Sequence, residues 1–281
     1  MKVVVTGAGG QLGRELPGAF AEHDVVALTS AELDITDAGA VMGRLHAEAP
    51  ALVVNAAAYT KVDACEEDPV PAWGVNAAGA WHLALVCREL GATLVHVSTD
   101  YVFDGTLDRP YTEFDAVGPR SVYGRTKEAG EQLVRDTLDR HYIVRTSWLH
   151  GRHGGNFLRT MLRVGRERDQ VSVVDDQRGS PTFADDLARA IAALVTTGAY
   201  GTYHRTNTGA CTWFDLARAA YQRADIAVDV LPTTTAEYGA PAPRPANSVL
   251  DNRKADLLGL DPLPPWEESL ERFLEHLATD A

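Results

Sequence analysis

The N-terminal stretch constrains the fold more than any other part of the chain. It reads VVVTGAGGQLGRELPGAF from Val3 to Phe20. Its β-branched residues predict a buried strand, its glycines a tight turn, and the residues after them an amphipathic helix. Gly7, Gly10 and Gly13 form G-x-x-G-x-x-G, which lets a backbone approach a pyrophosphate bound at the start of the next helix. The stretch predicts a dinucleotide-binding turn, with a plain strand-to-helix turn as the alternative.

Strand and helix patterns alternate as far as residue 150. Buried strands are predicted at Lys2–Thr6, Asp24–Leu28, from Leu52, Thr93–Val97 and Tyr142–Gly151, and helices at about 37–48, at 73–90 and around Tyr123. This alternation predicts an α/β fold with a Rossmann-type doubly wound parallel sheet. We expect an NAD(P)-binding domain over 1–150 that also uses about 169–198, and a smaller C-terminal α/β domain, mainly substrate-binding, over 151–281.

The pattern changes from about Gly154. Helices are predicted at Asn156–Gln170, Ser180–Val195 (capped), near Trp213–Arg223 and at about Pro265–Leu277, and strands at 171–176 and Ile226–Leu231. The stretch Thr233–Lys254 is proline-rich and irregular, which is typical of a lid-like loop. Arg244 lies in this loop, where it could pair with a diphosphate.

The end of the second strand bears on the choice of nucleotide. Thr29 and Ser30 stand where many NAD enzymes carry an acid that binds the ribose 2′-hydroxyl. With no carboxylate there to repel a 2′-phosphate, the sequence favours NADPH, with NADH as the alternative. Asp34 and Ile35 follow in AELDIT, and Asp34 is also a candidate N-cap for the helix from about Asp37.

Small residues follow the third strand. Ala56, Ala57 and Ala58 stand at a strand end where open α/β sheets bind ligands, so a flat cofactor could pack closely there. Tight packing of the next helix is the alternative reading of these three alanines.

Tyr123 and Lys127 are the candidate catalytic pair. Their i, i+4 spacing puts the phenol and the ammonium on one helix face. A fixed ammonium nearby lowers the pKa of a phenol toward the working range of a proton donor. Thr99, at the end of the fourth strand, could supply a second hydroxyl to a substrate oxygen. The alternative is a surface lysine one turn from a half-buried tyrosine. Trp148 reads as a core aromatic or a pocket wall.

Composition excludes several classes of partner. The net charge of −13 argues against binding to nucleic acid or to an anionic membrane surface. Cys65, Cys87 and Cys211 are far apart, with no C-x-x-C and no metal-ligand spacing, so we expect reduced structural thiols and no bound metal. The chain opens directly on a strand and contains no apolar run of about 18 residues, so we expect a cytoplasmic protein.

Together these motifs resemble the extended short-chain dehydrogenase/reductase superfamily and, nearly end to end, its dTDP-4-dehydrorhamnose reductases. The resemblance rests on GAGGQLG, LVVNAAAYTKVD, VHVSTDYVFDG, VYGRTKEAGE, VRTSWLHG, NFLRTML, VDDQRGSPT and RPANS. It implies NADPH-dependent reduction of the C4 keto group of a dTDP-4-keto-6-deoxyhexose. It also implies roles for matching residues: Gly10, Gln11 and Leu12 along the pyrophosphate, Asp34 and Ile35 near adenine, Ala56, Ala57 and Ala58 by the ribose and nicotinamide, Tyr123 as proton donor, Lys127 on the ribose, Thr99 on the same oxygen as Tyr123, and Asp100 with Trp148 lining the sugar pocket.

The resemblance leaves some points open. Asn76 is implied as a support for Lys127, with capping or packing as the alternative. A few relatives form a metal-bridged homodimer through acids, and Glu15 with Asp185 fall at comparable places, although surface acids are usually only solvated. The competing functions are reduction of another dTDP-4-keto-6-deoxy sugar, a related epimerase, and a non-catalytic regulatory protein on the same fold.

Overall fold

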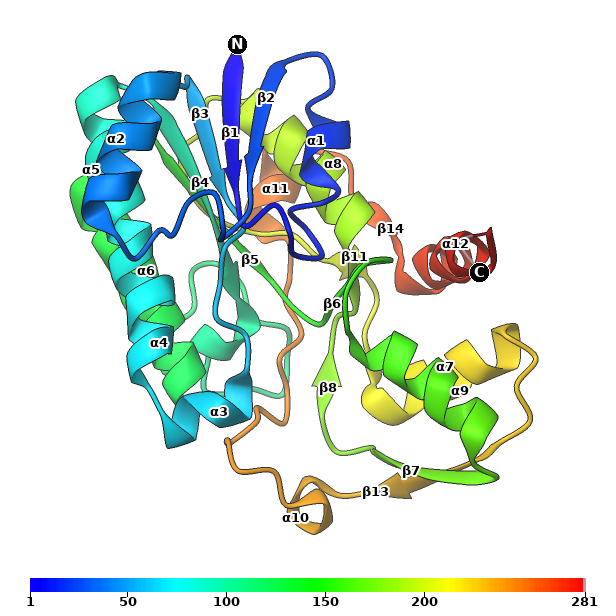
Figure 1. The fold of residues 1–281 in the computed structure, drawn as a ribbon. Helices are drawn as coiled ribbons and strands as arrows, with labels where there is room; N and C mark the ends of the chain where they lie inside the picture. Colours follow the sequence, from blue (N-terminus) through cyan, green and yellow to red (C-terminus); the bar gives the residue numbers. More distant parts are fainter. Residues whose placement is uncertain (280–281) are drawn as a thin grey trace.

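The centre of the molecule is a six-stranded parallel sheet (Figure 1). The computed structural model describes residues 1–279. The strand order is β10-β5-β4-β3-β1-β2. The strands are β1 (Lys2–Thr6), β2 (Asp24–Leu28), β3 (Leu52–Asn55), β4 (Thr93–Thr99), β5 (His141–Thr146) and β10 (Gly201–His204). The chain crosses from β2 past β1 to β3, so the β1 and β3 ends flank the topological switch point where open α/β sheets bind ligands.

Helices cover both faces of this sheet. One face carries α2 (Ala38–Glu48), α5 (Ala80–Leu90) and α6 (Val122–Thr137), and the other carries α1 (Leu16–Ala19) and α8 (Ala184–Val195) (Figure 1). Alternation along β1 divides its valines between the two layers: Val4 packs with α2 and α5, whereas Val3 and Val5 pack with α1 and α8. The predicted doubly wound α/β fold is confirmed.

A smaller lobe extends beyond the carboxyl ends of the strands, below the sheet in Figure 1. Its strands form pairs: β13 with β7, β12 with β8, β6 with β9, and β11 with β14. The strands are β6 (Leu149–His150), β7 (Gln170–Val174), β8 (Arg178–Gly179), β9 (Thr182–Phe183), β11 (Asn207–Thr208), β12 (Cys211–Thr212), β13 (Asp229–Thr233) and β14 (Leu263–Pro265). The remaining helices are α3 (Val62–Glu67), α4 (Val70–Ala72), the π-helix η1 (Trp73–Gly79), the 3-10 helix η2 (Asp100–Val102), α7 (Phe157–Glu167), α9 (Trp213–Arg223), α10 (Thr235–Tyr238), α11 (Arg253–Leu257) and α12 (Trp266–Thr279).

The predicted helices after the glycine turn and from Ser180 are shorter in the structure. The helix after the glycine turn is a single turn, because Pro17 can occupy only the first turn of a helix and α1 therefore begins at Leu16. The helix predicted from Ser180 begins at Ala184 without a side-chain cap, since Thr182 and Phe183 form β9 instead.

Strand boundaries differ in two places. The strand predicted over Tyr142–Gly151 is broken after Thr146, because Trp148 adopts a left-handed φ of +46°. The strand predicted at Ile226–Leu231 lies at Asp229–Thr233. The division into domains at residue 150 stays a prediction.

The three cysteines are buried free thiols, as expected. No helix within residues 1–279 has the length and apolar character needed to cross a membrane.

Candidate active site

The glycine turn after β1 is held tightly against β3. Gly7 has a φ of +72°, and a Cβ there would lie 2.5 Å from the Ala57 nitrogen. A Cβ on Gly13 would lie 2.1 Å from the Gly7 carbonyl oxygen. Only glycine fits at either position, because the contacts are with backbone atoms. The turn therefore sits at the switch point, and its own amides rather than a long helix dipole are available for a phosphate.

The side chains within the turn point away from such a ligand. Gln11 Oε1 accepts hydrogen bonds from the Gly151 nitrogen at 2.7 Å and from Asn156 Nδ2 at 2.8 Å, which ties the turn to the smaller lobe. Leu12 is 4% exposed and packs in the core. Gly10 N donates to the Gly7 carbonyl at 3.0 Å and completes the turn. Gln11 and Leu12 can therefore serve a pyrophosphate only through their backbones.

The end of β2 carries an acid that the sequence analysis missed. The Thr29 nitrogen and hydroxyl both donate to Glu32 Oε2 at 2.8 Å, whereas Ser30 is exposed. These bonds from Thr29 hold the pKa of Glu32 below its usual value. The expectation that no carboxylate stands beside Thr29 and Ser30 is wrong, because a local turn folds Glu32 back over three residues.

Asp34 and Ile35 have separate structural tasks. Asp34 Oδ1 accepts from the Thr36 nitrogen at 2.9 Å, so Asp34 closes a turn, while Asp37 caps α2 through the Ala40 nitrogen at 3.0 Å. The alternative of Asp34 as N-cap is therefore wrong. Ile35 is 3% exposed and packs so closely on Gly79 that a Cβ there would lie 2.7 Å from Ile35 Cδ1.

The residues after β3 remain partly open. Ala56 and Ala57 are partly buried and Ala58 is exposed. The Ala57 nitrogen donates to Asn55 Oδ1 at 3.1 Å, which bends the chain sharply at the strand end. This leaves three small side chains beside the glycine turn.

The predicted catalytic hydroxyl groups come together at the end of β4. Thr99 is 6% exposed and donates from its hydroxyl to Asp100 Oδ1 at 3.0 Å. Asp100 is 2% exposed, and burial raises its pKa to about 6 against the opposing hydroxyls of Ser248 and Thr99. The Thr99 hydroxyl also interacts with the Tyr123 phenol across from α6.

Tyr123 is buried rather than half-exposed. Ser121 caps α6 by accepting from the Gly124 nitrogen at 3.0 Å, which sets Tyr123 in the first turn. Burial raises the pKa of the Tyr123 phenol, and the Thr99 hydroxyl opposes that rise. The expected lowering by Lys127 is absent, because the i, i+4 spacing fixes only the face of the helix and not where the ammonium points.

Lys127 points under the sheet end in this structure. It is 1% exposed, and its Nζ donates to the Val97 carbonyl at 2.6 Å and lies 3.5 Å from His96 Nε2. Burial lowers the pKa of Lys127 to about 8, and the Glu131 carboxylate opposes this. The alternative of a surface lysine is therefore wrong.

Asn76 connects the neighbouring segments to α6. Its Oδ1 accepts from the Tyr59 nitrogen at 2.8 Å, and its Nδ2 donates to the Thr126 hydroxyl at 3.0 Å. Asn76 thus holds α6 one residue before Lys127 without a hydrogen bond to the lysine itself.

Trp148 packs against a second aromatic side chain, as expected of a core aromatic, and its place in a pocket wall stays a prediction. Its ring stacks on Trp213 with centroids 3.5 Å apart and planes 9° apart, and a Cβ on Gly179 would lie 2.4 Å from it. The side chain is nevertheless only partly buried, and its left-handed backbone is strained. Such strain is retained where surrounding structure enforces it, often at binding sites.

Arg244 is already paired. Its two terminal nitrogens donate to the two Asp63 carboxylate oxygens, both at 2.8 Å, and Nη1 also donates to the Ala242 carbonyl. Tyr101 links this pair to the site, because its ring meets Tyr123 edge-on at 5.4 Å and the charges of Arg244 and Asp63 act on its phenol.

The two acids considered for a metal bridge bind arginines instead. Glu15 pairs with Arg152 at 2.9 Å, and Asp185 pairs with Arg189 at 3.1 Å. Within residues 1–279 no three His, Cys, Asp or Glu side chains gather as a metal site would require.

Sequence reasoning missed several residues that the site depends on. His96 and Asn55 support Lys127 from β4 and β3, and Ser248 reaches Asp100 from the irregular loop. His96 interrupts the apolar strand TLVHV, and Asn55 ends the strand LVVN, so both could have been noticed as polar residues in buried strands. Nothing local marks Ser248, since it approaches only through the fold.

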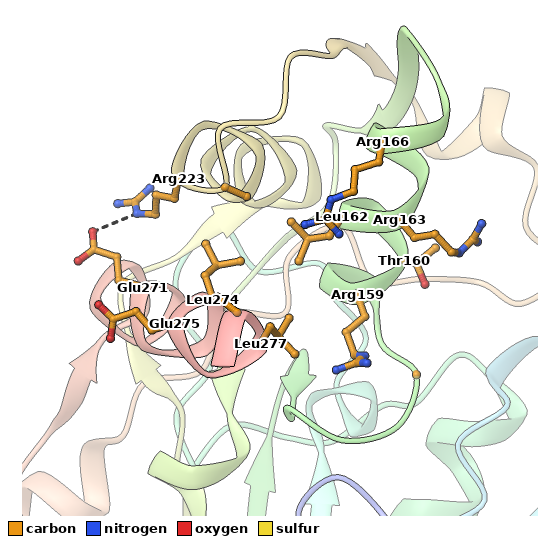
Figure 2. Close-up of a pocket in the computed structure, with 13 residues that line it drawn as sticks. Arg159, Thr160, Leu162, Arg163, Arg166, Arg223, Glu271, Leu274, Glu275 and Leu277 are labelled. Atoms are coloured by element: carbon orange, nitrogen blue, oxygen red, sulfur yellow. Dashed lines mark hydrogen bonds and ion pairs between the residues drawn. The ribbon is translucent and has the colours of Figure 1, made fainter. Parts of the chain in front are cut away.

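A separate groove lies in the smaller lobe. It has a volume of about 1020 Å³ and runs between α7, α9 and α12. Figure 2 shows Leu162, Leu274 and Leu277 between the helices, with arginines of α7 along one side. None of the predicted site residues lines it.

A doubly wound sheet with a glycine turn at its switch point, with buried Thr99 at the end of β4 and buried Tyr123 and Lys127 on the adjacent helix α6, is the architecture of the extended short-chain dehydrogenases/reductases. Residues 1–279 match the family described as RmlD substrate binding domain, and the chain belongs to that family.

Individual relatives agree with this assignment. A dTDP-4-dehydrorhamnose reductase of Streptomyces griseus is 47% identical over 95% of this chain and 91% of its own length. A dTDP-4-keto-6-deoxy-D-glucose reductase of Streptomyces niveus is 44% identical over 99% and 98%. The crystal structure of a dTDP-4-dehydrorhamnose reductase from Bacillus anthracis in complex with NADP has a TM-score of 0.96 at 43% identity, covering 98% of this chain and 99% of that one.

Proposed function

We propose that this chain is an NADPH-dependent reductase of the C4 keto group of a dTDP-4-keto-6-deoxyhexose, acting on dTDP-4-dehydro-L-rhamnose to give dTDP-L-rhamnose. The observation that carries the proposal is that the buried Thr99 and Tyr123 hydroxyls interact with each other. Lys127 lies one helical turn after Tyr123 on α6. Relatives that bear the name of this reductase over nearly the whole chain support the substrate class.

The residues at the switch point fit a dinucleotide. Gly7 and Gly13 keep the turn compact, and the three alanines after β3 leave room for a flat ring system. Bound there, NADPH supplies the hydride. The NADP complex of the Bacillus anthracis relative supports this choice, whereas Glu32 beside Thr29 is the feature that would favour NADH.

The chain's own residues handle the proton. Tyr123, kept protonated by its burial, gives its phenolic proton to the oxygen that develops charge at sugar C4, and Thr99 hydrogen-bonds the same oxygen. An ammonium has three donors, and the Val97 carbonyl takes one from Lys127, which leaves two for ribose hydroxyls. We assign Asp100 and Trp148 to the wall of the sugar site.

A second candidate substrate is another dTDP-4-keto-6-deoxy sugar. The Streptomyces niveus relative favours it, because that protein carries the name of such a reductase at similar identity. Product analysis separates the two. Homodimer formation stays a prediction from the resemblance, and the net charge of −13 supports an assignment without a nucleic-acid partner.

The decisive variant is Tyr123→Phe, which removes only the hydroxyl. We expect nucleotide binding to persist and kcat to fall by about 10²-fold to 10⁴-fold, because a positioned acid is lost. NADPH and NADH oxidation are followed with dTDP-4-keto-6-deoxyglucose, with and without a 3,5-epimerase, and the product sugar is identified.

Tyr142→Phe is the matched control, since Tyr142 is a buried tyrosine on β5 in the core facing α8. Turnover of this control should stay at the parent rate. A Tyr123→Phe variant that reduces the sugar within about threefold of the parent contradicts the mechanism. Nucleotide binding without any reduction by the parent chain would instead identify a regulatory protein.

A further inference from the structure

A chain of buried polar groups runs beneath the site. Thr6, Asn55 and His96 are wholly buried, and Lys127 is 1% exposed. The Thr6 hydroxyl donates to Asn55 Oδ1 at 2.8 Å, Asn55 Nδ2 lies 3.1 Å from His96 Nδ1, and His96 Nε2 lies 3.5 Å from Lys127 Nζ. The chain thus links β1, β3 and β4 to α6.

The orientation of the Asn55 amide is determined by the backbone. The Ala57 nitrogen lies 3.1 Å from Asn55 Oδ1, and a backbone N–H can only donate. Turning the amide over would place its NH₂ group against this N–H, two donors facing each other in a buried site. The amide therefore presents its NH₂ group to His96.

This orientation determines the tautomer of His96. Burial is the main cause that holds the pKa of His96 well below its usual value, so the ring is neutral and carries one proton. Nδ1 accepts from Asn55 and must be unprotonated, which leaves the proton on Nε2. Nε2–H is the group that faces Lys127.

We propose that Asn55 and His96 are positioning residues that present an N–H group to Lys127 and thereby favour its uncharged amine in the nucleotide-free chain. A neutral amine can accept from Nε2–H while donating to the Val97 carbonyl, whereas an ammonium meets the positive end of the N–H dipole. At 3.5 Å the contact is long for a hydrogen bond, so it acts as a dipole rather than a strong bond.

Two other titratable groups lie near His96 and Lys127, and neither prevents the lysine from being uncharged. Glu131, one turn along α6, favours the charged lysine, but its carboxylate is engaged by Arg145 of β5 at 2.7 and 2.9 Å and by Arg135 at 3.0 Å. Tyr123, one turn back, stays neutral because burial raises its pKa. Burial itself lowers the pKa of Lys127 to about 8, so a further lowering by the N–H dipole brings it toward neutral pH.

The catalytic consequence rests on the proposed function. Ribose hydroxyls can accept from an ammonium, so nucleotide binding would draw a proton onto Lys127. The lysine would then be charged only when the nucleotide is in place.

Nuclear magnetic resonance of the nucleotide-free full chain tests the inference without any activity. Labelled histidine reports which His96 nitrogen carries the proton, and labelled lysine reports the titration of Lys127, which is one of only four lysines. We expect the His96 proton on Nε2. His96→Phe identifies the His96 signal by its loss.

Asn55→Asp is the tautomer switch. A carboxylate of the same shape still accepts from Ala57 N–H and Thr6 but now also accepts from His96, so the ring proton should move to Nδ1. The Nε2 lone pair would then face the ammonium, and the proton dissociation constant of Lys127 should fall about tenfold or more. Thr6→Val is the matched control, because Ala57 N–H still orients the Asn55 amide and the tautomer should not change.

The double variant Asn55→Asp, His96→Phe separates the ring from the added charge. If the effect passes through the ring nitrogen, the double variant loses most of it. A full effect in the double variant overturns the proposal. So does a parent chain whose His96 carries its proton on Nδ1, and this last measurement needs no variant to fold.

Discussion

Asp100 shows how the burial of one carboxyl group makes the stability of the fold depend on pH. Its carboxyl is almost fully buried, and burial raises its pKa to about 6 from the ordinary 3.8. Because the folded chain binds this proton more tightly than the unfolded chain does, the contribution of Asp100 to stability is present below the unfolded pKa and is lost as the pH rises through about 6.

Substituting Asp100→Asn removes this titration. We expect the free energy of unfolding of the variant, relative to the parent, to improve by about 2 kcal/mol between about pH 4.5 and about pH 8. Urea unfolding at both pH values measures it. Asp108→Asn, at an exposed carboxylate of the next loop, should show no such trend. Equal pH trends in the two variants would mean that Asp100 is solvated.

What the sequence revealed at this scale is the identity of the candidate reactive groups. The Thr99 and Tyr123 hydroxyls lie together, and Lys127 follows one turn along the same helix as Tyr123. The direction of the Lys127 amine was not predictable, since it depends on the Val97 carbonyl and His96 from another strand. Glu32 was missed because a turn, rather than the strand itself, brings it to Thr29.

At the scale of elements, α6 lies unusually close to η1. A Cβ on Gly130 would lie 2.1 Å from the Asn76 carbonyl oxygen, so only glycine allows this approach. The contact holds the helix of Tyr123 and Lys127 against the segment that carries Asn76. A π-helical segment of this kind often occurs at functional sites.

Gly130→Ala should therefore lower the free energy of unfolding by about 1 to 3 kcal/mol, because backbone atoms must move apart. Gly43→Ala is the matched control: Gly43 also lies within a helix, but a Cβ there meets nothing within 4 Å. That control should gain about 0.5 to 1 kcal/mol, as alanine does in an open helical position. The midpoints of urea unfolding of the two variants and the parent measure these changes. A Gly130→Ala variant that is more stable than the parent would refute the close contact.

The elements themselves were predictable where the signals are local. The capping box of Thr212 with Asp215 starts α9 at the predicted residue, and Asn156 caps α7 as its sequence indicates. Strand β10 was missed, because the segment GTYH becomes a strand only by pairing with β5, which lies about 60 residues earlier in the chain. The shortness of α1 was not predictable from the local pattern, because the apolar periodicity favours a longer helix whereas Pro17 restricts where the helix can begin.

At the scale of the whole molecule, several polar contacts join the two lobes around the site, and three of them involve charged or amide side chains near the glycine turn or Tyr101. Gln11 binds Gly151, Glu15 binds Arg152, and Asp63 of α3 binds Arg244 of the irregular loop. The first two lie beside the glycine turn. The Asp63–Arg244 pair stands near Tyr101, and its members are 43% and 17% exposed, so a charged substrate can reach it.

The last prediction concerns this pair. If the diphosphate of the nucleotide sugar takes Arg244 from Asp63, Arg244→Ala should raise KM for the sugar by about 10-fold to 100-fold and leave the NADPH Kd unchanged, because a bidentate charged contact is lost. Asp63→Asn frees the arginine, so KM should stay equal or fall. Arg166→Ala, an exposed arginine in the groove of Figure 2, is the control and should change neither constant. An unaltered KM in Arg244→Ala would place the diphosphate elsewhere, and a raised KM in Asp63→Asn would show that the pair maintains the loop rather than yielding to the substrate.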